Sequence, residues 1–449
     1  MRTWRDRSDR PGPAEWRNWS GTARAEPRRT LRPATTDEIS AVVAQARERG
    51  RRLRPLGSGH SFSPIAAPDP GSDALDLRAH AGIVSVDPVS GLVTVRAGTT
   101  LGALNTALAA RGLALTNLGD IDAQTVAGAL ATGTHGTGTR FGGLATQVAA
   151  LELVTADGSV VRCAPDENPA LFDAARVGLG ALGVVTTVTL RCEPAFVLAA
   201  REGPEPLEHV LESFAERAEN CDHVEFYWFP YGRDALVKRN TRQPPGTVAR
   251  PLSAVRRFVD YTLTENAAFG ALCRLGRAAP RLVPVLGALA SSALSAREYS
   301  DVSYRVFTTH RAVRFVESEY AVPRAAVLDV LDGLRALVPR LRHPVAFPVE
   351  VRVAAADDIW LSTAYGRDTA YIAVHQYAGM PYREYFTEFA RIAASVGGRP
   401  HWGKMHDLDA AALRPLYPRF DDFVRVRSEV DPTGVFANAH LDRVLGPVV

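Results

Sequence analysis

In the first two hundred residues, segments whose apolar residues are spaced as in a helix alternate with segments whose apolar residues are spaced as in a strand. Residues 34–50 space apolar side chains as a helix does, with Thr36 as the expected N-cap and a stop at Gly50. Residues 83–95 predict a hairpin with its turn between Pro88 and Gly91, and residues 100–112 predict a second helix. Residues 150–164 predict another hairpin that turns at Asp157-Gly158, and a β-branched strand ends near Pro194. Helices and short strands therefore alternate through this part of the chain.

From about residue 196 the elements become longer. Residues 206–219 and 324–341 have the pattern of amphipathic helices, whereas three segments rich in aromatic and β-branched residues predict strands: 223–231, 346–355 and 369–378. This order predicts an antiparallel sheet that helices cover on one face. The tail, residues 432–446, is short, and we expect it to pack back onto the first part of the chain.

Composition and charge restrict the class of protein. At 449 residues, with 46% hydrophobic and 22% charged residues, the chain has ordinary globular values and is long enough for two or three domains. The net charge of +3 comes from scattered arginines rather than blocks, so we expect no nucleic-acid partner. The four cysteines lie far apart, which argues against a zinc knuckle or a disulfide framework and favours reduced thiols in the cytoplasm.

Neither the N-terminal segment nor the longest apolar stretch indicates export or insertion into a membrane. The first nineteen residues carry charge and tryptophan where a signal peptide needs an apolar core. The longest apolar stretch, residues 282–296, contains Pro284 and is shorter than the roughly 20 residues that span a bilayer. We therefore expect a buried helix there and no association with membranes.

Two glycine-rich segments are candidates for a phosphate site. The first is Gly57-Ser58-Gly59-His60-Ser61, whose small residues let backbone N–H groups approach an anion closely. The second, residues 119–143, surrounds His135 with glycines and threonines. Together the two loops can enclose the pyrophosphate of a dinucleotide, although the first loop taken alone is also typical of a surface turn. The first loop lacks the third glycine and the later acidic residue of a Rossmann site, so NAD is not expected.

Polar side chains also recur at strand spacing in the second half. In FPVEVRV, Glu350 and Arg352 share one face of a strand while three valines share the other; in AYIAVHQY, His375 lies on the face of Tyr371 and Tyr377. If the two strands are neighbours, these faces form one polar floor. A solvated sheet face with a surface ion pair is the alternative.

Residues 399–407, RPHWGKMHD, gather further polar groups. Lys404 in this tight loop can act as a fixed cation beside developing negative charge, or it can belong to an ordinary surface loop. His401 and His406 have a spacing that metals use, but no acidic or thiol partner lies at a ligand-like spacing, so we expect no metal site.

Six segments resemble, in matching order, the aldonolactone oxidoreductases of the vanillyl-alcohol-oxidase flavoprotein superfamily. They are GSGHSFSPIA, AGALATGTHGTG, GALGVVTTVTL, PVEVRV, HWGKMH and DPTGVFANAHLDRVLG. The resemblance runs from about residue 15 to the C-terminus; the group includes L-gulono-1,4-lactone and D-arabinono-1,4-lactone oxidases, with alditol oxidases as a sister branch. It implies an α+β fold with a two-lobed FAD-binding domain of the PCMH type, residues 1–195 with the tail 410–449, and a cap domain, residues 196–409, whose antiparallel sheet is covered by helices.

The resemblance also implies a cofactor and roles for residues. FAD would be bound, with His60 at the position that is commonly bonded to the flavin 8α-methyl group. Arg352 and Lys404 match positions that stabilise the reduced flavin, Glu350 or Lys404 would assist with the hydroxyl proton, and His375 would hold the substrate. Further FAD contacts are expected from Gly57, Ser58, Gly59, Ser61, Phe62, Gly128, Thr132, Gly133, Thr134, His135, Gly136, Gly183, Val184 and Val185.

The predicted function is FAD-dependent oxidation of a sugar 1,4-lactone, with L-gulono-1,4-lactone oxidised at C2 as the first choice. An alditol oxidase is the nearest alternative, but those enzymes tend to carry threonine where this chain has Tyr377, which favours a lactone over an open-chain polyol. A nucleotide-binding or metal-dependent hydrolytic protein built on the same loops is the alternative from another class. The electron acceptor, oxygen or another oxidant, and the oligomeric state stay open.

Overall fold

The computed structural model describes residues 15–448, and the chain up to residue 195 forms two small sheets with helices between them. One sheet is parallel, with strand order β3-β5-β4; the other is antiparallel, with order β10-β9-β11-β7-β6. Their strands are β3 (Arg29–Leu31), β4 (Leu53–Leu56), β5 (Asp73–Asp76), β6 (Ile83–Val86), β7 (Leu92–Arg96), β9 (Val148–Val154), β10 (Val160–Cys163) and β11 (Val184–Arg191). The helices are α1 (Thr36–Glu48), α2 (Leu101–Ala109), α3 (Val126–Ala131) and α4 (Pro169–Ala175). Two short strand pairs complete this part: β1 (Trp16–Arg17) with β2 (Arg24–Ala25), and β8 (Leu113–Ala114) with β12 (Glu193–Pro194).

The local predictions for this region are confirmed apart from one cap. Both expected hairpins form, as β6 with β7 and β9 with β10. The first helix is capped by Thr35 and not by Thr36, because the extended Thr35 accepts a hydrogen bond from the backbone N–H of Glu38 while Thr36 is already helical. Gly50 follows the helix with φ +58°, a conformation that favours glycine.

The second part of the chain is built on an eight-stranded antiparallel sheet with order β16-β13-β15-β14-β18-β19-β17-β20. Its strands are β13 (Val197–Pro206), β14 (His223–Trp228), β15 (Asp234–Arg242), β16 (Arg297–Val302), β17 (Phe315–Pro323), β18 (Val349–Ala354), β19 (Thr369–Tyr377) and β20 (Arg399–Pro400). Three helices, α5 (Leu207–Asn220), α10 (Val327–Leu337) and α11 (Arg383–Ala394), share one apolar core with one face of this sheet. Val349, Val351 and Val353 point into that core, as strand alternation predicts, so Glu350 and Arg352 point to the opposite face. The expected antiparallel sheet covered by helices is confirmed.

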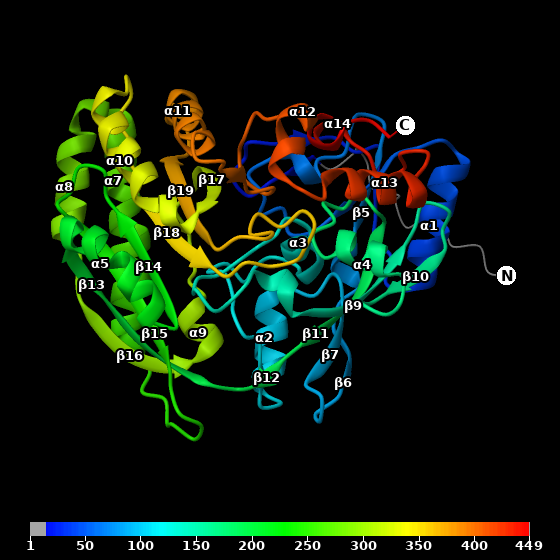
Figure 1. Ribbon diagram of the computed structural model, residues 1–449, viewed down its shortest axis with the longest axis horizontal. Helices are drawn as coiled ribbons and strands as arrows, with labels where there is room; N and C mark the ends of the chain where they lie inside the picture. Colours follow the sequence, from blue (N-terminus) through cyan, green and yellow to red (C-terminus); the bar gives the residue numbers. More distant parts are fainter. Residues whose placement is uncertain (1–14, 449) are drawn as a thin grey trace.

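Three C-terminal helices, α12 (Ala410–Leu413), α13 (Phe420–Val430) and α14 (Ala439–Leu445), lie beside the N-terminal strands (Figure 1). The N–H of Leu53 in β4 donates to the carbonyl of Val435 at 2.7 Å, and the Asn438 amide donates to the carbonyl of Ala67 at 2.8 Å. The buried guanidinium of Arg54 donates to the carbonyl of Phe436 at 2.8 Å. These bonds tie the tail to the strand that leads into the first glycine-rich loop. The domain boundaries after residues 195 and 409 stay predictions.

Residues 254–292 form a helical unit on the sheet domain, and here one prediction is wrong. The unit consists of α6 (Ala254–Arg257), the π-helical η4 (Phe258–Ala268), α7 (Phe269–Ala278) and α8 (Val283–Ser292). Although α8 is the helix expected within residues 282–296, Val285 and Leu289 are 66% and 54% exposed rather than buried. The reason is that α7 and β15 contact one side of α8, and its other side faces outward. None of the helices within residues 15–448 is long and apolar enough to cross a bilayer.

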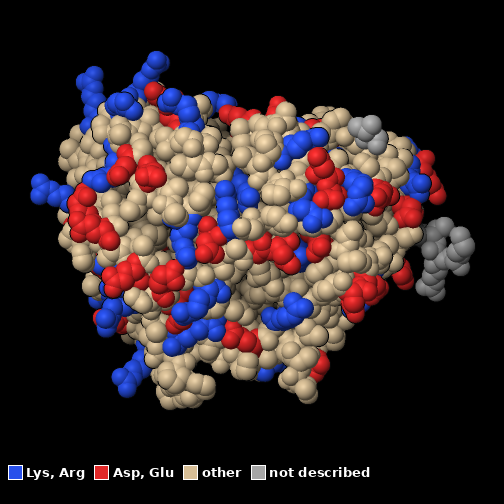
Figure 2. Space-filling view, viewed as in Figure 1, with Lys and Arg blue, Asp and Glu red and all other residues tan. Residues whose placement is uncertain are grey.

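Charge on the visible surface is mixed. On the face shown in Figure 2, acidic and basic side chains are interspersed over both parts of the molecule. Nucleic-acid-binding proteins usually show a stripe or patch of one sign instead.

Candidate active site

The first glycine-rich loop lies in a cavity that we call the glycine-lined cavity. It contains about 1030 Å³ of space free of protein atoms, and the residues that line it come from the loop after β4, from α3, from the turn before β11 and from β11 itself. The N-terminal segment holds the loop in place: the Trp19 N–H donates to the Gly59 carbonyl at 2.7 Å, and the Asn18 amide donates to the Ser61 carbonyl at 2.9 Å. Gly59 has φ +72°, which explains a glycine at the point where the chain turns.

Most of the predicted cofactor residues line this cavity. They are Gly57, Ser58, Gly59, His60, Ser61, Gly128, Thr132, Gly183 and Val185. Gly133, Gly136 and Val184 line neither this cavity nor the next one. Val184 belongs to an apolar core, because neighbouring strand residues face opposite sides and only Val185 can point into the cavity. Gly133 takes up a turn with φ +74°, and Gly136 packs against Asn117 and Leu118.

The two glycine-rich segments approach each other closely beside the Thr125 hydroxyl. A Cβ atom on Gly57 would lie 2.7 Å from Thr125 Oγ1, and one on Gly128 would lie 2.9 Å from the same oxygen. Only glycine therefore allows this approach, which keeps open a narrow, backbone-lined space of the kind that a dinucleotide pyrophosphate needs. The residues present fit FAD at this place.

A second cavity, the polar cavity, continues from the first. It contains about 1490 Å³ of free space and shares His60, Ser61, Gln124 and Thr132 with the glycine-lined cavity. These four residues, His60 among them, therefore lie where the two spaces join. Burial lowers the pKa of His60, and the positive charge of Lys404 lowers it further, so its ring is neutral near pH 7. Predicted residues that line the polar cavity in addition are Phe62, Thr134, His135, Glu350, Arg352, His375 and Lys404.

The floor of the polar cavity is the face of the large sheet opposite the helices. Strand β18 pairs with β19, so that Glu350 lies opposite Ala373, and β14 pairs with β18, so that Tyr227 lies opposite Glu350. On the other side of β19, Glu317 of β17 lies opposite His375. The strands that carry Glu350 and His375 are therefore neighbours, as the predicted polar floor required. The floor is buried and not exposed to solvent.

Glu350 and Arg352 form the centre of this floor. Their side chains make an ion pair at 2.5 Å, and Tyr227 donates its hydroxyl to Glu350 at 2.7 Å. Burial raises the pKa of Glu350, and the negative charges of Asp120 and Glu225 add to this effect against the attraction of Arg352. Arg352 also donates to Glu225 at 2.7 Å. The negative charges of Glu225 and Glu350 keep the pKa of Arg352 well above its ordinary value, although burial alone would lower it.

Lys404 enters the same cavity from the loop after β20. Its ammonium group lies 2.5 Å from Glu317 and 3.6 Å from Glu319, and it stands over the ring of Phe62. Burial opposes its charge, but the two carboxylates outweigh burial and raise the pKa of Lys404. The group is therefore a permanent cation at neutral pH and cannot accept a proton. His375 completes this side: its Nδ1 lies 2.9 Å from the Pro348 carbonyl, and its Nε2 lies 3.5 Å from Glu317.

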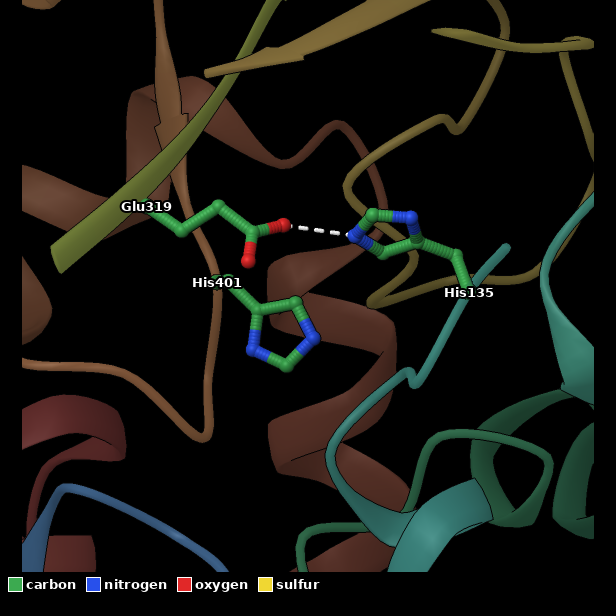
Figure 3. A group of neighbouring side chains, drawn as sticks. All are labelled: His135, Glu319 and His401. Atoms are coloured by element: carbon green, nitrogen blue, oxygen red, sulfur yellow. Dashed lines mark hydrogen bonds and ion pairs between the residues drawn. The ribbon is translucent and has the colours of Figure 1, made fainter. Parts of the chain in front are cut away.

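His135, Glu319 and His401 form a buried cluster from three separate segments (Figure 3). Glu319 lies 2.5 Å from Nε2 of His135, whose Nδ1 lies 2.9 Å from the Gly136 carbonyl. In His401, Nδ1 accepts the N–H of Gly403 at 3.0 Å, and burial lowers the pKa of this ring to about 4. A neutral ring with Nδ1 as acceptor carries its proton on Nε2, so neither nitrogen offers a free lone pair to a metal. The arrangement favours a hydrogen-bonded support.

A second group of ligand-type side chains, Glu317, Glu350 and His375, belongs to the floor already described. His406, which the sequence paired with His401, is in neither group.

Sequence reasoning missed several residues of the polar cavity. Glu317 and Glu319 alternate in FVESEYAV as Glu350 and Arg352 do in FPVEVRV, so the same rule would have found them. Asp120 has no such signal: its carboxylate binds Arg311 at 2.6 Å and lies 3.7 Å from Arg352, contacts that only the folded chain creates. Other missed lining residues include Trp19, Gly119, Gln124, Tyr227, Phe269, Phe315, Phe347 and His401.

Comparison with known proteins decides the family. The family model described as D-arabinono-1,4-lactone oxidase matches residues 188–444, and an FAD binding domain matches residues 27–164. The chain belongs to the D-arabinono-1,4-lactone oxidase family. A Mycobacterium tuberculosis protein named L-gulono-1,4-lactone dehydrogenase is 43% identical over 96% of this chain and 99% of its own length. A Bos taurus protein named L-gulonolactone oxidase is 34% identical over 96% and 98%.

A solved structure of lower sequence identity shares the fold of this family member. The crystal structure of cholesterol oxidase from B. sterolicum has a TM-score of 0.80 and 19% identity, and covers 96% of each chain. This likeness shows the fold alone. With the family established, this aldonolactone oxidoreductase is an FAD-dependent enzyme acting on a CH–OH group, and the expectations of FAD, of the enzyme class and of the α+β fold are confirmed.

Proposed function

We propose that the enzyme oxidises L-gulono-1,4-lactone at C2 to the ketone that precedes L-ascorbate. The observation that carries this proposal is the join between the two cavities at His60: a backbone-lined space for FAD opens directly onto a floor of fixed charges. The name of the 43% identical relative supports this lactone in particular. D-arabinono-1,4-lactone, named by the family model, is the next candidate within the same class.

In the proposed mechanism the two glycine-rich loops would hold FAD, which would supply the acceptor for a hydride from the carbinol carbon. Glu350 accepts the proton of the substrate hydroxyl, because it lines the polar cavity and its raised pKa gives its carboxylate a stronger affinity for a proton. Because Lys404 is permanently protonated and cannot accept a proton, Glu350 is the base of the two candidate residues. Arg352 and Lys404 hold positive charge in the polar cavity, where it would stabilise the negative charge of the reduced flavin.

His375 orients the substrate in this mechanism. The Pro348 carbonyl, 2.9 Å from Nδ1, and the Glu317 carboxylate, 3.5 Å from Nε2, fix the orientation of its ring, which lines the polar cavity. A ring held in this way can contact a second hydroxyl of the lactone without competing for the proton that Glu350 removes.

The substrate is tested by anaerobic reduction of the flavin. L-Gulono-1,4-lactone is expected to bleach the flavin absorbance within seconds, whereas xylitol and sorbitol leave it unchanged. Bleaching by the polyols with the lactone inert would select an alditol oxidase instead. Tyr377 stacks on Phe347 and does not line the polar cavity, so the size of its ring does not by itself favour a lactone over a polyol.

We further propose that FAD is covalently bonded to His60. The neutral ring at the junction of the two cavities is in the protonation state that a nucleophile needs. His60→Ala is expected to release its flavin completely on acid precipitation, whereas the native protein keeps the flavin in the pellet. Ser61→Ala, one residue along the same loop, serves as the control and is expected to retain it. Flavin that stays with the pellet in His60→Ala would contradict the bond.

A cytoplasmic location is also proposed, supported by the thiols. All four cysteines are free, and burial raises the pKa of Cys163 and Cys273 to about 12 and that of Cys192 to about 11. Protonated, unpaired thiols are typical of proteins in a reducing compartment.

A further inference from the structure

We propose that the outer face of the helical unit, residues 254–292, docks onto an anionic lipid surface. This face is the outer side of the unit, and its docking does not depend on the identity of the substrate. The sequence predicts instead a buried helix within residues 282–296 and no association with membranes, whereas Val285 and Leu289 of this helix are exposed.

Exposed apolar side chains gather on this unit. Among residues 15–448, thirteen large apolar side chains are exposed, and eight of them lie within the 39 residues of the helical unit. Single exposed apolar residues are normal on any protein surface, but a concentration of them marks an interaction site. The eight are Val255, Phe258, Val259, Leu263, Leu275, Leu282, Val285 and Leu289.

On α8 the exposed residues occupy one side. Leu282, the N-cap residue of α8, and Val285 and Leu289 within the helix follow one another at intervals of three and four positions, so they project from the same side. The opposite side is held inward, where Val283 and Ser291 are buried and the Ser291 hydroxyl donates to the Asp234 carbonyl at 2.9 Å. The apolar row is therefore fixed in an outward orientation by contacts on the other side of the same helix.

The charge around this row selects the occupant. Three exposed arginines next to this row form no ion pair among residues 15–448: Arg274 and Arg277 of α7, and Arg281 just before α8. The other charged residues of the unit are already paired: Arg256 with Asp260, Arg257 with Asp301, and Glu265 with Arg297. A second copy docking through a twofold axis would bring arginines against arginines. An anionic lipid surface complements the charge and also accepts the apolar side chains at the level of its headgroups.

The unit also contacts the catalytic region from its inner side. Phe269 of α7 lines the polar cavity, and Cys273, one turn later, packs in the cluster that contains Phe315 and Phe347. The surface that docks thus backs one wall of the substrate cavity. Docking would bring this wall, rather than the glycine-lined cavity, close to the lipid.

The test is sedimentation of the FAD-loaded enzyme with vesicles. The native protein is expected to sediment with vesicles that contain phosphatidylglycerol and phosphatidylcholine, less so at high salt, and not with phosphatidylcholine alone. The double variant Val285→Asp/Leu289→Asp is expected to lower the partition coefficient by at least about tenfold, because two apolar contacts are lost and negative charge is added. Its activity without vesicles should be unchanged, which shows that it is folded.

The matched control is Val89→Asp/Val160→Asp, which adds the same charges at two exposed valines of the other domain. This variant is expected to bind anionic vesicles as the native protein does. The proposal is overturned if the native protein ignores anionic vesicles, or if both double variants bind equally well. It is also overturned if the native protein forms a dimer that Val285→Asp/Leu289→Asp dissociates, since the patch would then join two copies of the chain.

Discussion

Glu350→Gln is expected to lower kcat/KM for L-gulono-1,4-lactone by about 10²–10⁴-fold, the usual contribution of a general base. The amide keeps the shape of the side chain and can still accept the Tyr227 hydroxyl, but it cannot take the substrate proton. Arg352 keeps its bond to Glu225, so the fold is expected to tolerate the change. The measurement is the rate of flavin reduction as a function of lactone concentration under anaerobic conditions.

The pH dependence of the reaction gives an independent check on this base. The carboxylate form of Glu350 exists above its raised pKa, so activity is expected to fall as the pH falls through that value. This acid limb should disappear from the profile of Glu350→Gln. Glu225→Gln is the matched control, because Glu225 binds the same arginine without lining the polar cavity. An equal loss of rate in both variants would mean that the carboxylates act only by holding Arg352.

Lys404→Met is expected to affect stability and reaction together. Removal of the ammonium group leaves Glu317 buried with His375 at 3.5 Å as its remaining partner in the cavity, while Glu319 keeps His135. Breaking a buried ion pair in this way lowers the free energy of unfolding by about 3 kcal/mol, measured by urea denaturation. Loss of a fixed cation beside the reacting groups should also slow flavin reduction by about 10²–10³-fold.

Lys238→Met separates these two effects. Lys238 is a comparably buried ammonium group, 3.5 Å from Glu225, but it does not line the polar cavity. This variant is expected to lose stability while its rate of flavin reduction falls much less. If Lys404→Met loses stability alone, Lys404 has a structural role and the proposed electrostatic role is wrong.

Much of the catalytic floor could be predicted because strand geometry is local. Side chains alternate along a strand whatever surrounds it, so Glu350 and Arg352 share a face in any fold that keeps this strand. The same rule would also have excluded Val184 from the cofactor contacts once Val185 was included, and would have added Glu317 and Glu319. Hairpins were equally accessible, since the turn residues that form them are adjacent in the sequence.

Contacts between distant segments were not accessible in this way. Asp120 joins Arg311 and Arg352 across nearly two hundred residues or more, and no local pattern links them. The exposure of α8 has the same origin. Its apolar composition fits a buried helix, but which sides of a helix are covered depends on the neighbours that the fold supplies.

The sequence by itself determined the glycine-rich loops, the alternation of polar and apolar side chains on the strands and the family to which they belong, because each rests on neighbouring residues or on their order. Only the tertiary structure decided that β17 joins the floor beside β19, that Lys404 is held as a cation between Glu317 and Glu319, and that the row at Val285 and Leu289 faces outward. These features depend on burial and on packing between segments far apart in the chain, and both exist only once the whole chain is folded.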